Sequence, residues 1–96
     1  DAKSWFQLAA AYASLSRWPE AIDAYEKTLA LDPDDAVAMF DLGGAHWNSG
    51  DAATAVDVWK TAIKRFPDHE LCATLKRGFP SLFSDPVADQ PANGAR

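Results

Sequence analysis

The residues whose side chains could carry catalysis are few and scattered. The 96-residue chain contains two histidines, His46 and His69, and one cysteine, Cys72. Its serines do not stand with a histidine and an acid in a context that would activate a hydroxyl, and no nucleophile elbow or phosphate-binding glycine loop occurs. We therefore expect no enzymatic activity.

Metal-binding patterns are equally weak. His69 lies between Asp68 and Glu70, but a zinc site needs three or four ligands, and Cys72 alone cannot form a thiolate cluster or an internal disulfide. We expect Cys72 to be a buried thiol. The acidic run at 32–35 lacks the spaced acids and the glycine of an EF-hand, so a turn with a helix cap is favoured. The sequence predicts no metal and no cofactor.

Composition excludes several other classes of function. The net charge of −5 argues against binding to nucleic acid or to an anionic membrane surface. No apolar run approaches the ~18 residues that span a bilayer, so we expect no membrane insertion. The chain begins at Asp1 without an initiator Met, which suggests a trimmed N-terminus. A cytoplasmic location is favoured, and a periplasmic one stays open.

The main organising feature is an internal repeat with a period of 34 residues. Large residues fall on large ones and small on small when the chain is shifted by one period. The aligned pairs are Trp5 with Met39, Leu8 with Leu42, Ala9 with Gly43, Tyr12 with His46, Ala21 with Ala55, Tyr25 with Trp59, and Pro33 with Pro67.

Each unit contains two apolar stripes with helical spacing, the first in each case followed by a break. Ser16 is expected to cap the second helix and Pro33 to end it. In the second unit Asp35 and Asp51 are expected to cap the two helices, with Gly50 ending the first in a left-handed conformation. Small residues at matching positions would let antiparallel helices approach closely. These positions are Ala9, Gly43, Ala21 and Ala55.

These residues resemble the pattern of the tetratricopeptide repeat family, Trp-x2-Leu-Gly-x2-Tyr, then Ala-x3-Phe, then Pro. The resemblance covers two tandem repeats, 2–35 and 36–69. It implies an all-α fold, a right-handed superhelix of antiparallel helix hairpins with about five helices. The departures are Ala9, Met39 and His46. His46 takes the place of an aromatic core residue, so we expect a packed side chain that would titrate near neutrality if partly exposed.

A third unit begins after Pro67 and stops. We interpret 68–77, capped by Asp68, as a closing helix that covers the last repeat. The apolar segment 79–83 either folds back, which we favour, or serves as a docking element. With it the domain spans 1–83, and a disordered tail is expected over 84–96.

The resemblance implies that the first helix of each hairpin lines a concave, partner-binding groove. An apolar surface there would mark a contact site, unless Phe6 and Phe40 simply pack on each other. The candidate groove residues are Lys3, Phe6, Ala10, Ala13 and Ser14 in the first repeat, Val37, Phe40, Gly44, Trp47 and Asn48 in the second, and Leu71 and Thr74 in the closing helix.

The predicted function is a protein-binding module for an apolar or amphipathic segment. Chaperone-binding members of the family grip a carboxylate with Lys and Asn, but those places hold Phe6, Ala10, Asp41, Leu71 and Leu75 here. We therefore expect no carboxylate-clamp chaperone tail as the partner. Self-association and a positioning role within a larger protein are the alternatives.

Overall fold

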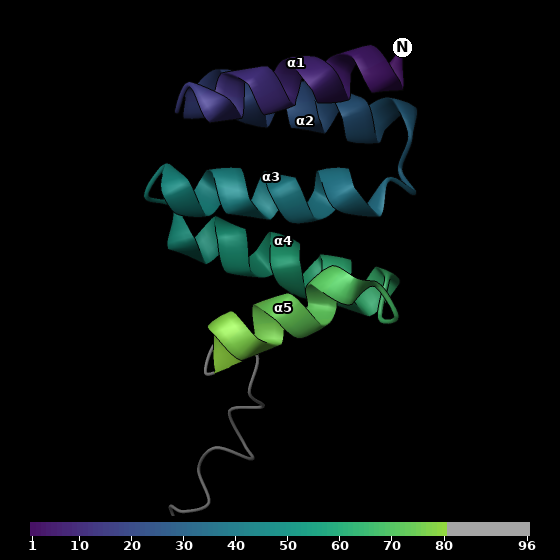
Figure 1. Cartoon of the computed structure of the whole chain (residues 1–96), viewed down its shortest axis with the longest axis vertical. Coiled ribbons are helices and arrows are strands. Elements are labelled where there is room, and N and C mark those ends of the chain that lie inside the picture. The colour runs from purple at the N-terminus through teal and green to yellow at the C-terminus, as the bar shows by residue number, and fades with distance from the viewer. Residues whose placement is uncertain (81–96) are drawn as a thin grey trace, which may run out of the picture.

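A computed structural model describes residues 1–80, which form five helices stacked along one axis (Figure 1). The helices are α1 (Ala2–Ser14), α2 (Trp18–Leu31), α3 (Ala36–Asn48), α4 (Ala52–Arg65) and α5 (Glu70–Gly78). Helices α1 and α2 form one antiparallel hairpin and α3 and α4 a second, while α5 crosses the far edge of α4 obliquely (Figure 1). The predicted all-α architecture of helical hairpins is confirmed.

Most of the expected helix ends are present. The side chain of Asp35 accepts a hydrogen bond from the backbone N–H of Ala38 at 3.0 Å, and Asp51 accepts one from Thr54 at 3.1 Å. Both capping predictions are confirmed. Gly50 ends α3 with a φ of 97°, as its position after the last apolar residue predicts.

The prediction that Ser16 caps α2 is wrong. Ser16 has a φ of 58°, and Arg17 precedes α2 without a side-chain cap. The N–H of Arg17 donates to the carbonyl of Tyr12, and the N–H of Ser16 to that of Ala13. These two bonds close the end of α1 as a Schellman motif, with Ser16 at the left-handed position that Gly50 occupies in the second hairpin. Ser16 cannot both end α1 in the left-handed conformation and cap the start of α2.

The start of the closing helix also differs from the prediction. Helix α5 begins at Glu70, and its cap is His69, whose Nδ1 accepts a hydrogen bond from the N–H of Leu71 at 3.1 Å. Asp68 lies in the turn that the His69 N–H closes by donating to the carbonyl of Phe66, so it stands too early to cap. Phe79 packs back onto the domain. Residues 81–83 of the apolar segment and the expected tail 84–96 lie outside the described residues.

The helix crossings explain how the hairpins close. Ala9, Ala21 and Ala55 are fully buried, and Gly43 is buried as well, as expected for small residues at crossings. The Trp59 ring lies directly over Gly43, and its Nε1–H donates to the carbonyl of Phe40 at 3.1 Å. At the equivalent positions the first hairpin has Tyr25, whose ring is smaller than that of Trp59, and Ala9, which is larger than Gly43. In each hairpin the size of the aromatic ring is thus matched to the size of the small residue with which it is paired.

The adjacent glycines of α3 should respond oppositely to alanine. A Cβ at Gly43 would overlap the Trp59 indole, whereas nothing lies within 4 Å of a Cβ at Gly44. Gly43→Ala should lower the free energy of unfolding by about 1–3 kcal/mol through overpacking. Gly44→Ala should raise it by about 0.5–1 kcal/mol through helix propensity. Urea denaturation of both variants is the measurement, and equal stabilities would contradict this account of the crossing.

Candidate partner-binding face

Helix α3 is packed on three sides and open on one. Ala38, Leu42 and Ala45 are buried in the core shared with the first hairpin. Gly43 faces α4, and Phe40 packs in the cluster shared with α4 and α5. The remaining side holds residues spaced three and four apart, which is one face of a helix. They are Val37, Asp41, Gly44 and Asn48.

The repeat period identifies the equivalent side of α1, and that side is also uncovered. Lys3, Gln7, Ala10 and Ser14 occupy the equivalent positions, and each is exposed. We call these four residues and the four of α3 the open face. It is the part of the predicted groove that remains accessible, and its side chains are small, polar or only moderately apolar.

The structure distributes the predicted groove residues among three levels of exposure. Exposed are Lys3, Ala10, Ser14, Val37, Asn48 and Thr74; half-buried are Phe6, Ala13, Gly44, Trp47 and Leu71; buried is Phe40. The prediction thus gathers mostly accessible residues, but its largest side chains are the least accessible ones.

The expectation that Phe40 lies open in the groove is wrong. Its side chain is 5% exposed and packs in a cluster with Ala55, Trp59 and Cys72. The His69 ring stacks near it at 5.4 Å between centroids. Helix α5 and the turn before it cover the position, so Phe40 belongs to the core. Its truncation would remove a core side chain, at about 3–5 kcal/mol for Phe to Ala, so it cannot serve as a test of binding.

The two other predicted aromatic anchors are also engaged within the domain. The Phe6 ring meets Tyr25 edge-on at 5.9 Å. Trp47 forms a cluster with Trp59 at 5.6 Å and Phe79 at 4.8 Å. Phe6 and Phe40 sit in different core clusters, so each is held by its own neighbours and not by the other. Both Phe6 and Trp47 are half-buried, so each keeps part of its surface accessible.

Asp41 is one of the two open-face residues, with Gln7, that the groove prediction left out. Burial, together with the charge of Asp35, raises the pKa of its carboxyl above the ordinary value. Burial and the charge of Asp41 in turn raise the pKa of Tyr25 to about 12. The Tyr25 ring, on α2, also contacts Phe6 of α1. The sequence signal that could have identified Asp41 was an acidic residue at the three- and four-residue spacing of the open face.

The outer helices present a different surface. The exposed side chains of α2 and α4 are mainly charged and include Asp23, Glu26, Lys27, Lys60 and Lys64. Asp23 and Lys27, four residues apart on α2, form an ion pair at 3.1 Å. A mixed-charge surface of this kind favours solubility over contact with an apolar partner. The open face is therefore the better candidate for binding.

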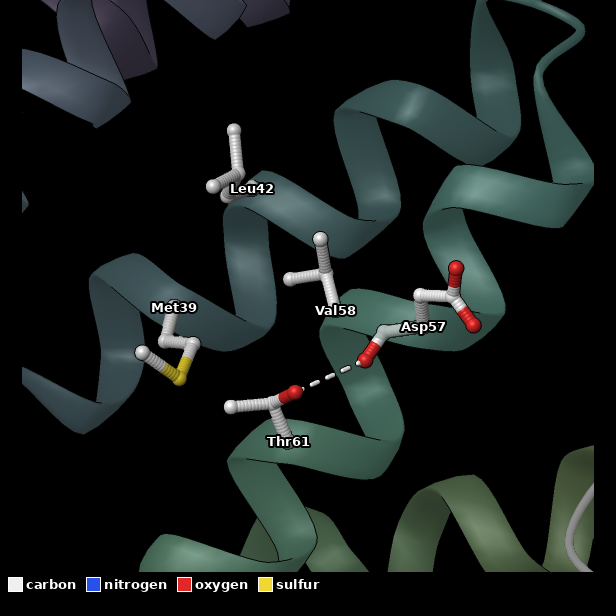
Figure 2. A pocket seen from close by; sticks show the side chains of 5 residues that line it. All are labelled: Met39, Leu42, Asp57, Val58 and Thr61. Atoms are coloured by element: carbon white, nitrogen blue, oxygen red, sulfur yellow. Dashed lines mark hydrogen bonds between the residues drawn. The ribbon is translucent and has the colours of Figure 1, made fainter.

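A separate hollow lies between α3 and α4, away from the open face (Figure 2). It has a volume of about 220 Å³ and is lined by Met39, Leu42, Asp57, Val58 and Thr61. In the first hairpin the positions of Met39 and Thr61 are held by Trp5 and Lys27, which form a cation–π contact at 4.6 Å. The hollow between α3 and α4 is smaller than the roughly 300 Å³ of typical ligand pockets. The equivalent positions of the first hairpin also line a hollow, of about 560 Å³, so the space is common to both repeats and does not depend on Met39.

The residues considered for metal binding have structural partners. The His46 side chain is 14% exposed, and its Nδ1 lies 4.0 Å from a carboxylate oxygen of Asp51, so the expected packed position is confirmed. Cys72 is buried, as predicted, and its thiol donates to the carbonyl of Phe66 at 3.0 Å. Within residues 1–80 no three His, Cys, Asp or Glu side chains gather as a metal site. No helix of this part has the length and apolarity needed to cross a bilayer.

Comparisons with known proteins agree with the repeat. Two models described as tetratricopeptide repeat match residues 2–35 and 37–69. The chain is 39% identical over 61 residues to the Hsp70-Hsp90 organizing protein of Triticum aestivum, covering 64% of this chain and 10% of that protein. It is 30% identical over 82 residues to the PEX5-related protein of Homo sapiens, covering 85% of this chain and 13% of that protein.

A third relative is a TPR repeat-containing protein of Pseudomonas aeruginosa, 33% identical over 60 residues, which are 62% of this chain and 10% of that protein. The chain thus spans only 10–13% of the length of these curated relatives.

The charge of Asp41 should destabilise the free domain at neutral pH. A carboxyl whose pKa is raised on folding favours the folded state below its ordinary value of 3.8 and loses that contribution as pH rises through the higher folded value. Asp41→Asn should therefore raise the melting temperature at pH 7, and the gain should vanish near pH 3. Asp57→Asn, at an exposed position on α4, is the control. A gain of equal size at both pH values would contradict the burial of this charge.

Proposed function

We propose, from the premise that the chain belongs to the tetratricopeptide repeat family, that its open face binds an apolar or amphipathic segment of another protein. The chain is a protein-interaction module. One relative is named for organizing Hsp70 and Hsp90, which is an action on other proteins and supports a binding role here.

The observation that carries the proposal is the open space at Gly44. Nothing lies within 4 Å of a Cβ there, while Ala10 holds the equivalent position on α1. Small residues at both positions allow another backbone to approach the two helices closely. Val37, which is 40% exposed, and the half-buried Phe6 and Trp47 would give this surface apolar contacts. A segment lying across α1 and α3 would cover these side chains.

The composition of the face argues against an acidic C-terminal tail as the ligand. The places that hold clamp residues in chaperone-binding relatives carry Phe6, Ala10 and Asp41 in the two repeats and Leu71 and Leu75 in α5. None of these side chains carries a positive charge, and Asp41 would repel a carboxylate. This supports an apolar segment as the ligand and stands against recognition of a free carboxylate.

A second candidate, self-association, is favoured by the outer side of α1. Leu8 is 40% exposed, whereas its equivalent Leu42 is 8% exposed because the first hairpin covers it. Ser4 and Ala11 flank Leu8 and are exposed, while the equivalent Ala38 and Ala45 are buried. A second copy that covered this side would repeat the contact made between the hairpins.

The open face can be tested by blocking it with a long side chain. Ala10→Arg should keep the fold, because Ala10 is exposed and Arg is a good helix former. It should weaken binding of peptides selected on the wild-type domain from a random 16-residue display library by tenfold or more. Ala30→Arg, at an exposed position of α2, is the matched control and should bind normally. Equal binding by Ala10→Arg would place the site elsewhere.

Self-association has its own test. If α1 pairs with a second copy, the wild-type domain should sediment as a dimer at millimolar concentration, and Leu8→Lys should return it to a monomer by placing a charge on the contact. Leu31→Lys, at a position 59% exposed on α2, is the control. A wild-type domain that stays monomeric over the whole concentration series would rule this candidate out.

A further inference from the structure

Asp41 is an acid in an unusual position. It lies half-buried on the open face of α3, between Val37 and Gly44, and its charge acts on Tyr25 of α2, whose ring contacts Phe6 of α1. The repeat period places Gln7 at the equivalent position of α1. A neutral side chain therefore fits this position of the hairpin, and the charge is a particular property of the second repeat.

The carboxylate has no partner within residues 1–80. No hydrogen bond or ion pair involves it, although Asp23, Asp34 and Glu20 each pair with a cation elsewhere. The charge that raises its pKa further is that of Asp35, which has the same sign. Lys3, the cation on the open face of α1, forms no ion pair with it. A half-buried charge without a partner costs free energy that an apolar or amide side chain at that position would not.

The surroundings of Asp41 match one kind of ligand group. The carboxylate borders apolar and small side chains, so a ligand that covers the face would remove it further from water. Under that cover a neutral or acidic ligand would leave the charge unpaired, at a penalty, whereas an ammonium or guanidinium group would pair with it. Charge complementarity therefore selects the ligand by sign.

We propose that the segment bound on the open face carries a lysine or arginine, flanked by apolar residues, whose side chain pairs with the carboxylate of Asp41. This inference rests on the proposed function, because it specifies the ligand of the same face. Asp41 acts here as the specificity-determining residue, while the small residues Ala10 and Gly44 provide the room.

The experiment is a charge exchange with peptides from the random 16-residue library selected on the wild-type domain. Peptides whose binding is blocked by Ala10→Arg should share a Lys or Arg among apolar residues. Replacing that residue with Glu should weaken binding by tenfold or more, as should Asp41→Lys with the original peptide. Combining Asp41→Lys with the Glu peptide should restore much of the binding, which a purely structural role of Asp41 would not produce.

The possible failures are distinguishable. Peptides that are blocked by Ala10→Arg but lack a basic residue, or bind Asp41→Asn as tightly as wild type, would overturn the role of Asp41 and leave the proposed function standing. A selection that yields no peptide, or only peptides indifferent to Ala10→Arg, would overturn the proposed function and this inference with it. Circular dichroism of each variant confirms that the fold is retained.

Discussion

The close approach of paired helices at small residues is the constraint on which the rest of this structure depends. Where α3 crosses α4, Gly43 leaves room for the Trp59 ring, whose N–H then reaches a backbone carbonyl of α3. This bond adds an acceptor contact to a helix whose carbonyls are already used, and it fixes the rotation of α3 about its own axis. A side chain at Gly43 would force the helices apart and remove that restriction.

The rotation of α3 decides what the molecule can offer to a partner. Once Gly43 faces α4, the helical period turns Ala38 and Leu42 toward the first hairpin and Phe40 toward α5. Within residues 1–80, the side with Asp41 and Gly44 is the one that no other helix covers. The open face is therefore a consequence of core packing and not a separately built site. Its character follows from whichever residues the sequence places at those few positions.

Much of the fold could be predicted from the sequence, because the helix ends depend on neighbouring residues and the hairpin arrangement depends on the 34-residue repeat. The caps Asp35 and Asp51 and the left-handed Gly50 follow from short-range chemistry. The failures have the opposite origin. Ser16 adopts the left-handed conformation that ends α1, so it is not available to cap α2. Phe40 is buried under α5, and the repeat pattern does not specify the angle at which α5 packs. Identical residues at equivalent repeat positions can also differ in exposure, because their neighbours differ: Leu8 is 40% exposed and Leu42 is 8% exposed.

The burial of the aromatic rings changes where binding energy is expected to come from. Phe6 and Trp47 are half-buried, and Phe40 is almost fully buried. Interfaces usually depend on a few large anchors seated in well-packed surroundings. On the proposed function, the large anchors would come from the partner and lie over Ala10 and Gly44, because the open face itself offers small, polar or only moderately apolar side chains. The proposed complex would therefore place bulky side chains of the partner on small residues of this chain, and the proposed pairing with Asp41 would supply its selectivity.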